Sequence, residues 1–285
     1  MHFYYDWSFM KRKVLFFDRE LIKNFWGHLS VLLTIFSGVI LFVDDTPLKE
    51  KWFYPLGFTV ILVLYYTLLW HNSNSLENID FKIENTKISI VTGDLFEQDG
   101  LKVIAFNEYF DTQVDDKIIS KNSLNGIFIE RFFPSTVETL DDYISNYEFS
   151  EENILEKNTT RITGKKQKYQ IGTVCLYDDF LLTAFSKFND KNQAYLTMPE
   201  YLSFLIKFWD EINVVYAQRS VSVPIFGSGI TRIKEHKNIT DEELLKIMLW
   251  TFKISETRFK YPAQLRIVIH EDKIDTINLF EIKSM

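Results

Sequence analysis

The stretch "SIVTGDLFEQDGLKVIAFNEYFDTQVDDKII", residues 89–119, decides the fold of the larger part of this chain. It contains two short runs rich in Ile, Val and Phe, and each run predicts a strand. Gly93 and Asp94 follow the first run, and Asn107 closes the second. The stretch therefore places an acidic residue after one strand and an asparagine at the end of the next.

The rest of this part of the chain alternates strands with helices. Strands are predicted at residues 87–91, 101–106, 172–176, 180–186, 220–226 and 265–270. Apolar residues recur at helical spacing over residues 199–216 and 240–255, and the second helix begins with a capping box of Thr240 and Glu243. This order predicts an α/β/α sandwich, whereas the polar residues 141–170 predict an insertion or a mobile loop.

Two runs near the N-terminus predict membrane spans. Residues 25–43 and 52–70 contain no Asp, Glu, Lys or Arg, and each is 19 residues long. A helix of that length approaches the thickness of the hydrocarbon core of a bilayer, which is about 30 Å. We expect a two-helix transmembrane hairpin within residues 1–75 and a separate domain of residues 76–285. A hydrophobic hairpin buried inside a soluble fold is the alternative, and a cleaved signal peptide fits poorly.

The basic residues give the hairpin an orientation. Five of them precede the first span, whereas two lysines and three acids share the connector, so the positive-inside rule places the N-terminus in the cytoplasm. Two crossings return the chain there, which predicts a multi-pass inner (plasma) membrane protein with a cytoplasmic domain. Residues 1–17 are expected as an interfacial helix or a disordered tail, and His28 as an interfacial residue rather than a proton relay.

Composition excludes several function classes. The chain has 285 residues, 46% of them hydrophobic, which is enough for a substantial core. Its net charge of −7 argues against nucleic-acid binding, which needs a basic face. The single cysteine, Cys175, rules out an intrachain disulfide, and the five histidines show no metal-ligand spacing with it. We therefore expect no metal and no cofactor.

The segment "SVSVPIFGSGITRI", residues 220–233, is a strand that runs into a glycine pair. Gly227 and Gly229 permit positive φ and allow backbone N–H groups to point at an anion. The segment lacks the Lys-Ser/Thr of a P-loop and the third glycine of the Rossmann fingerprint. A structural turn without a ligand remains the alternative.

Taken together, these segments resemble the macro domain, a family that binds ADP-ribose. Residues 93–95 resemble the family's "GDI" turn, whose aspartate binds the adenine amine, and Asn107 resembles an asparagine beside the distal ribose. Residues 114–119 resemble the start of the family's next helix, and residues 223–230 resemble its diphosphate loop. The ligand-binding residues that the resemblance implies are Asp94, Leu95, Phe106, Asn107, Thr112, Gln113, Val114, Pro224, Phe226, Gly227, Ser228, Gly229, Ile230 and Thr231.

One departure from the family pattern argues against catalysis. Hydrolases of the family carry a glycine run after the asparagine, and this chain has the bulkier residues 108–113 instead, so we expect a binding module and no catalytic residues. The carboxylates of Glu108, Asp111, Asp115 and Asp116 suit either acid–base chemistry or the solvated start of a helix, and the latter is the simpler explanation for all four, above all for Asp116. Residues 122–126 form either a second glycine turn of the site or an ordinary turn.

Two spans followed by this variant of the macro domain resemble the membrane effector of type II Thoeris anti-phage defence. The resemblance implies a TIR-domain partner enzyme that makes an ADP-ribose conjugate, reported for the family as histidine joined to ADP-ribose. It also implies that binding promotes homo-oligomerisation, membrane disruption and abortive infection. The alternatives are a membrane-anchored ADP-ribosyl hydrolase and a constitutive membrane scaffold that has lost its ligand.

Overall fold

The computed structural model describes residues 13–43, 52–189, 191–229, 231–234, 236, 238–255, 259–260 and 262–284. The chain divides into two compact units, one of Met1–Ile79 with Asp275–Met285 and the other of Asp80–Ile274. The interfacial helix or disordered tail expected at residues 1–17 lies mostly outside the described residues.

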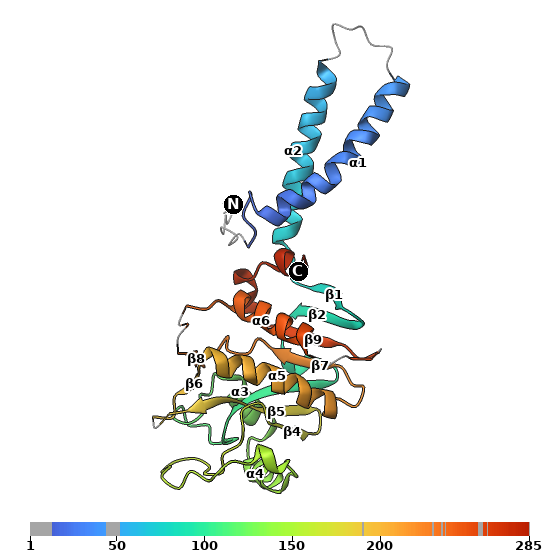
Figure 1. Cartoon of the computed structure of the whole chain (residues 1–285). Coiled ribbons are helices and arrows are strands. Elements are labelled where there is room, and N and C mark those ends of the chain that lie inside the picture. Colours follow the sequence, from blue (N-terminus) through green and yellow to red (C-terminus); the bar gives the residue numbers. More distant parts are fainter. Residues whose placement is uncertain are drawn as a thin grey trace, which may run out of the picture. The chain divides into compact units, whose positions relative to one another are not determined.

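The first unit is built on helices α1 (Arg19–Val43) and α2 (Phe53–Asn74), which contain the two charge-free runs (Figure 1). Both are long and apolar enough to cross a membrane, and the most apolar window of each helix is not buried at all. This exposure argues against a hydrophobic hairpin buried inside a soluble fold. It favours the prediction of two membrane spans.

Aromatic contacts hold the two helices together. The rings of Phe36 and Phe58 stack with their centroids 4.4 Å apart, and Phe25 meets Tyr66 edge to face at 5.2 Å. His28 Nδ1 lies 2.6 Å from the Tyr65 hydroxyl, so this histidine forms a hydrogen bond between the helices.

Residues before α1 and after the second unit complete the base of the hairpin. Val14 is fully buried, its N–H donates to Asn74 Oδ1 at 2.9 Å, and its carbonyl accepts from Trp70 Nε1 at 3.0 Å. Lys13 lies 3.7 Å from Asp275 at the start of the C-terminal segment, which ends in helix α7 (Leu279–Lys283). The first unit is therefore made from both ends of the chain.

The second unit contains one mixed sheet with the described order β1-β2-β9-β7-β3-β5-β6-β8, and β4 pairs with β5. The five strands from β2 to β5 in this order are parallel to one another. The strands are β1 (Ile79–Ile83), β2 (Thr86–Thr92), β3 (Leu101–Asn107), β4 (Val174–Tyr177), β5 (Phe180–Phe188), β6 (Ala194–Leu196), β7 (Val221–Pro224), β8 (Arg232–Ile233) and β9 (Leu265–Ile269).

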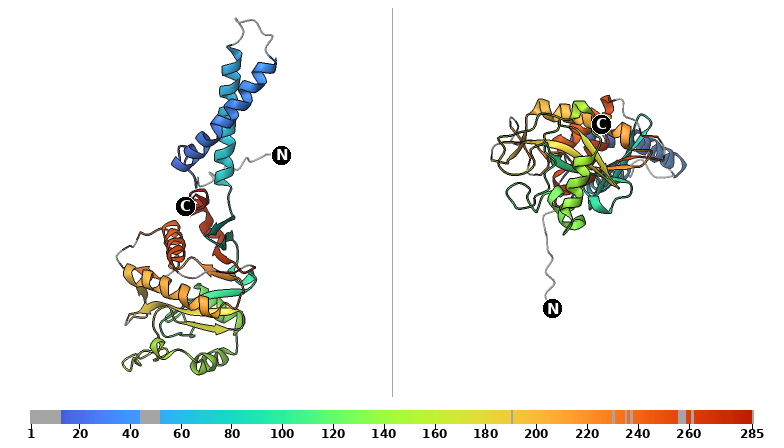
Figure 2. Two further views of the ribbon diagram at one scale, coloured as in Figure 1. Left: turned by 45° about the vertical axis from the view of Figure 1, so that its right-hand side comes forward. Right: turned by 90° about the horizontal axis from the view of Figure 1, so that it is seen from below.

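Helices cover both faces of this sheet, as predicted for a sandwich. Helices α3 (Leu124–Phe132) and α4 (Val137–Asn146) share a core with β3 and β5, in which Phe128 and Leu140 are fully buried. On the other face, Phe185 of β5 packs against Phe204 of α5 (Met198–Val215), and α5 packs on α6 (Asp241–Ile254). Figure 2 shows the two helix pairs on opposite sides of the strands.

The six strands and two helices predicted for this domain are present, and none of their ends differs from the prediction by more than two residues. The capping box of Thr240 and Glu243 is also confirmed. The sequence pattern missed β1, β6, β8, α3 and α4, which are short or carry weak periodicity.

The structure corrects three local predictions, one of them fully and two of them in one of their alternatives. Residues 114–119 do not start a helix but form a turn closed by a bridge between Val114 and Ile119. Residues 122–126 are not a glycine turn, because Ser123 caps α3 and Gly126 lies in its first turn. Residues 141–170 are not a loop without structure, because they begin within α4 and contain a short 3-10 helix (Glu151–Asn153) and a bridge between Ile154 and Tyr169, and the alternative of an insertion stays a prediction.

Helix α5 begins with a charged cap that ties it to the sheet. Glu200 accepts hydrogen bonds from the Thr197 N–H at 2.7 Å and from Lys187 Nζ of β5 at 2.5 Å. Burial alone would raise the pKa of the Glu200 carboxyl, but these hydrogen bonds outweigh it and lower the pKa to about 2. A carboxyl with a lowered folded pKa stabilises the fold above its unfolded pKa of about 4.3 and loses this contribution as the pH falls toward 2.

We therefore expect Glu200→Gln to lower the melting temperature at pH 7, where the charged hydrogen bonds are worth about 1 to 2 kcal/mol. The difference from wild type should shrink as the pH falls from about 4 to 2. Thermal unfolding of the full chain in detergent across this range measures it. Asp210→Asn, at an exposed position of the same helix, is the control, and an equal pH dependence in both variants would contradict the assignment.

Candidate functional site

A cleft of about 720 Å³ opens where β3, β5 and β7 end. Asn107 from β3, Ser186 from β5 and Pro224 from β7 lie in its wall. Parallel strands present their carboxyl ends at one edge of a sheet, which is where α/β proteins commonly bind ligands. The volume lies within the range of about 300 to 1,000 Å³ that is common for small-molecule sites.

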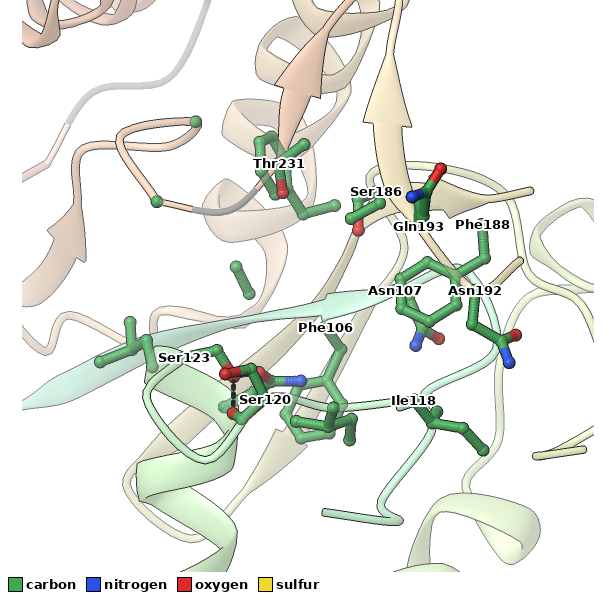
Figure 3. A pocket seen from close by; sticks show the side chains of 18 of the residues that line it. Phe106, Asn107, Ile118, Ser120, Ser123, Ser186, Phe188, Asn192, Gln193 and Thr231 are labelled. Atoms are coloured by element: carbon green, nitrogen blue, oxygen red, sulfur yellow. Dashed lines mark hydrogen bonds between the residues drawn. The ribbon is translucent and has the colours of Figure 1, made fainter. Parts of the chain in front are cut away.

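Two further segments form the sides of the cleft. One runs from Asp116 to Asn125 and leads into α3, and the other is the glycine-containing loop after β7. The turn between β5 and β6 closes one end, where Figure 3 shows Asn107, Phe188, Asn192 and Gln193 together, away from Thr231.

Two side chains from other elements form hydrogen bonds to carbonyl groups of the loop after β7. Tyr201 of α5 donates a hydrogen bond to the Phe226 carbonyl at 2.9 Å, and burial raises the pKa of this tyrosine, so it stays a donor. Lys273 Nζ donates to the Ser228 carbonyl at 3.2 Å and pairs with Asp241 at 3.1 Å. The Ser228 N–H donates to the Ile225 carbonyl at 3.3 Å, so the loop is held by its own backbone as well as by these two side chains.

The two glycines of this loop are not equivalent. Gly227 has φ of +89°, in the region that glycine favours, so the positive φ expected there is confirmed. Gly229 is exposed and its φ lies outside that region, so the expectation of positive φ is wrong there. A Cβ atom at Gly229 would meet no atom within 4 Å.

The opposite side of the cleft presents the beginning of α3. Ser123 Oγ accepts from the Gly126 N–H at 3.2 Å and lies 2.5 Å from the Ser120 carbonyl oxygen (Figure 3). Leu124 and Asn125, in the first turn of the helix, also line the cleft. The first N–H groups of a helix have no carbonyl partner within it, and together with the helix dipole they favour an anion.

The segment that replaces the glycine run folds inward. Asn107 Oδ1 accepts from the N–H groups of Tyr109 and Asp111 at 2.9 and 3.3 Å, so it caps the turn after β3. Glu108 pairs with Lys168 at 3.1 Å and accepts from the Phe188 N–H at 3.2 Å. The turn therefore forms hydrogen bonds with cleft residues of two strands, Asn107 of β3 and Phe188 of β5.

The carboxylates of this segment have different environments. Glu108 and Asp111 are 2% and 1% exposed, so the expectation of solvated charges at a helix start is wrong for both. Asp115 is half-buried and accepts from the Ile118 and Lys117 N–H groups at 2.8 and 2.9 Å, and the bond from Ile118 is the main cause of its lowered pKa. Asp116 lines the cleft and accepts from the Lys121 N–H in a turn, not at a helix start.

The predicted site residues divide into two groups. Those that line the cleft are Phe106, Asn107, Pro224, Phe226, Gly227, Ser228, Gly229 and Thr231. Asp94, Leu95, Thr112, Gln113 and Val114 do not line it, and Ile230 lies outside the described residues. For both groups, contact with a ligand stays a prediction.

Three of the residues outside the cleft have side-chain partners, one of them being Gln113, whose Nε2 donates to Asp115 Oδ2 at 2.9 Å. Asp94 accepts from the Phe96 N–H at 2.8 Å and from Arg131 at 3.1 Å, and Thr112 donates to Asp141 at 2.5 Å.

Sequence reasoning missed three parts of the wall. These are most of residues 116–125, the end of β5 and the turn at residues 191–194. None of these segments carries a strong motif, and the pointers to them are confined to the Asp116 carboxylate, the resemblance of residues 114–119 and the weak turn signal at residues 122–126.

Metal and thiol chemistry find little support in the described side chains. Among the described residues, no three histidine, cysteine, aspartate or glutamate side chains are grouped so as to hold a metal ion. Cys175 is buried, and burial raises the pKa of its thiol to about 12, far from that of a reactive thiolate.

Comparison with known proteins matches residues 88–270 to the family model described as "Thoeris protein ThsA, Macro domain". The Thoeris protein ThsA of Bacillus amyloliquefaciens (strain Y2) is 38% identical over 280 residues, which cover 93% of this chain and 91% of that protein. Among solved structures, a mutant of the Oceanobacillus iheyensis macrodomain has a TM-score of 0.47 at 14% identity, covering 73% of this chain and 97% of its own. The same macrodomain with ADP has a TM-score of 0.46 at 14% identity, covering 73% and 95%.

The unequal glycines allow a direct test of the loop. Gly227→Val should lower the unfolding free energy by about 1 to 3 kcal/mol, because a β-branched residue is strained at positive φ. Gly229→Val should leave the melting temperature near that of wild type, since its side chain points into open space. Thermal unfolding of the two variants in detergent checks this, and equal stability losses would contradict the loop geometry.

Proposed function

The chain belongs to the Thoeris ThsA macro-domain family, and on this premise we propose that it is a membrane-anchored effector of anti-phage defence. Its cytoplasmic macro domain senses an ADP-ribose-derived signal, namely histidine joined to ADP-ribose, made by a TIR-domain partner enzyme. Binding promotes homo-oligomerisation and disruption of the inner (plasma) membrane, and the infected cell dies before the phage can spread.

The observation that carries this proposal is the pair of anion-favouring walls on one cleft. The loop around Gly227 and the first turn of α3 both line the space at the ends of β3, β5 and β7. Lys117 and Lys191 line it as well. Backbone N–H groups on both sides suit the diphosphate of an ADP-ribose ligand, and the lysines add local positive charge.

The alternative is a membrane-anchored ADP-ribosyl hydrolase, which the buried carboxylates disfavour. Glu108 and Asp111 are each bonded to a basic side chain and to a backbone N–H inside the protein. A general base must reach the proton that it removes, and a carboxylate held in this way is poorly placed to do so. Steady release of ADP-ribose from an ADP-ribosylated protein or an ADP-ribose ester would instead favour the hydrolase.

The proposed adenine contact gives a prediction for Asp94. Its Oδ1 accepts from the Phe96 N–H, and the amide oxygen in the variant Asp94→Asn would keep that bond. The variant would, however, turn an NH₂ group in place of Oδ2 toward the adenine amine, and two donors cannot bond to each other. We expect the variant to bind ADP-ribose more weakly by roughly 1.5 to 3 kcal/mol, the worth of a charge-assisted hydrogen bond. Isothermal titration calorimetry of the full chain in detergent measures this change.

Arg131→Gln is the matched control, because Arg131 is the other partner of Asp94. Its removal should leave the affinity unchanged or improve it, since it frees a carboxylate oxygen. Equal weakening in both variants would mean that the ion pair, and not adenine recognition, explains the effect.

Assembly in the membrane has a candidate contact face on α1. Gly27, Ser30, Thr34 and Ser37 recur at helical spacing and are all exposed, whereas Phe36 contacts α2. The hydroxyls of Thr34 and Ser37 donate to carbonyls one turn earlier, at 2.9 and 2.8 Å. Small residues with satisfied hydroxyls let helices from several copies approach closely, and several copies are needed because two helices alone cannot enclose a polar path.

We expect the histidine–ADP-ribose conjugate to raise self-association and to cause leakage only from vesicles that carry the full chain. The double variant Thr34→Leu and Ser37→Leu should still insert but should leak at least several-fold less, because larger side chains keep the copies apart. Dye release from liposomes and sedimentation in detergent measure the two steps.

The matched control is Ile35→Leu with Val39→Leu, at exposed apolar positions of the same helix. Leakage that ignores the conjugate, or binding that leaves sedimentation unaltered, would contradict the sensor–effector function.

A further inference from the structure

A buried ion pair lies beside one end of the cleft. Arg161 Nη2 is 2.6 Å from Asp111 Oδ2, and Arg161 Nη1 is 3.1 Å from Asp111 Oδ1. The two side chains are 7% and 1% exposed. The Lys165 N–H and the Asn107 amide donate the remaining bonds to Asp111, at 2.7 and 2.9 Å, so each carboxylate oxygen accepts two. A buried pair is tolerated only when it is bonded as fully as this.

The surrounding residues are shaped to hold this pair. The Arg161 guanidinium lies 3.9 Å from the centre of the Tyr109 ring, which belongs to the segment after β3. Gly164 has φ of +83°, and a Cβ there would lie 2.6 Å from Asp111 Oδ1. The loop that carries Arg161 therefore comes so close to Asp111 that a side chain at position 164 would clash with the carboxylate.

The same pair bonds to two amide side chains in the cleft wall. Asp111 accepts from Asn107, and Arg161 donates to Asn192 Oδ1 at 3.2 Å. Asn192 has φ of +54° and donates to Thr163 at 3.2 Å. Figure 3 shows Asn107 and Asn192 near each other at the end of the cleft. One ion pair thus fixes two cleft residues from separate parts of the chain, one at the end of β3 and the other in the turn before β6.

Counting hydrogen bonds shows what these amides can offer. An amide oxygen accepts two bonds and its NH₂ donates two. Within the described part of the chain, Asn107 uses both acceptor positions and one donor, and Asn192 uses one of each. Two donors and one acceptor remain for a ligand group with oxygen or nitrogen acceptors.

We propose that Arg161 and Asp111 are positioning residues for ligand specificity. They hold Asn107 and Asn192 so that this end of the cleft distinguishes ligands by the polar group attached beyond the distal ribose. The inference rests on the proposed function, in which Asn107 lies beside that ribose. It assigns to the 154–170 segment the role of setting which ADP-ribose derivative the protein recognises.

The test compares two ligands in each variant. Isothermal titration calorimetry of the full chain in detergent gives dissociation constants for ADP-ribose and for its histidine conjugate, and their ratio is the readout. Arg161→Lys keeps the charge but loses the forked contact, and Asn192→Gly keeps the positive φ but removes the amide. Each should weaken the conjugate about tenfold more than ADP-ribose, which corresponds to about 1.4 kcal/mol.

Arg219→Lys is the matched control, because Arg219 pairs with Asp179 at an exposed position and lies outside the cleft lining. A merely structural role would lower the melting temperature and weaken both ligands in parallel. If Arg161→Lys does not fold, Asn192→Gly still decides, and a ratio within twofold of wild type overturns the inference. Failure of wild type to bind either ligand would overturn the proposed function, and this inference with it.

Discussion

The parallel pairing of β3 with β5 on one side and β7 on the other determines which segments meet at the cleft. The β3–β5 register pairs Phe106 with Ala184 and then, after a shift of one residue, Asn107 with Ser186. Because the strands are parallel, the segments that follow β3 and β7 leave from the same edge as the end of β5. The irregularity at Asn107 comes where the ladder ends, and there the asparagine side chain takes over by capping the next turn.

The same constraint explains how much the sequence could predict. Runs of Val, Ile and Phe mark the central strands, and Gly227 marks a turn that needs positive φ, because these signals are local. The partner of Asp111 lies 50 residues away in a polar segment without periodicity, so no spacing rule connects it with Arg161. Buried charges look like surface charges in a sequence, which is why Glu108 and Asp111 were assigned to solvent wrongly.

The last residue of β9 and the segment that follows it contact both predicted ligand loops. The Ile269 carbonyl accepts from the Gly93 N–H at 3.0 Å, next to Asp94, and Lys273 bonds to the loop around Gly227 through Ser228. One residue, Ile274, then separates Lys273 from Asp275, with which the C-terminal part of the first unit begins. A ligand that reorders either loop acts on a segment that is covalently continuous with the unit that holds the apolar helices. Such a change can shift assembly only by the difference in ligand affinity between the two states.

The net charge of −7 makes the local chemistry of the cleft decisive. An acidic protein does not draw anions from a distance, because its long-range field repels them. Lys117, Lys191 and the N–H groups of the loop and of α3 act over a few ångströms, where salt screens them least. An anion therefore gains binding energy only once it is inside the cleft and matches the groups there. Recognition by contact rather than by long-range attraction suits a sensor, because the many other nucleotides of a cell are also anions but differ in shape.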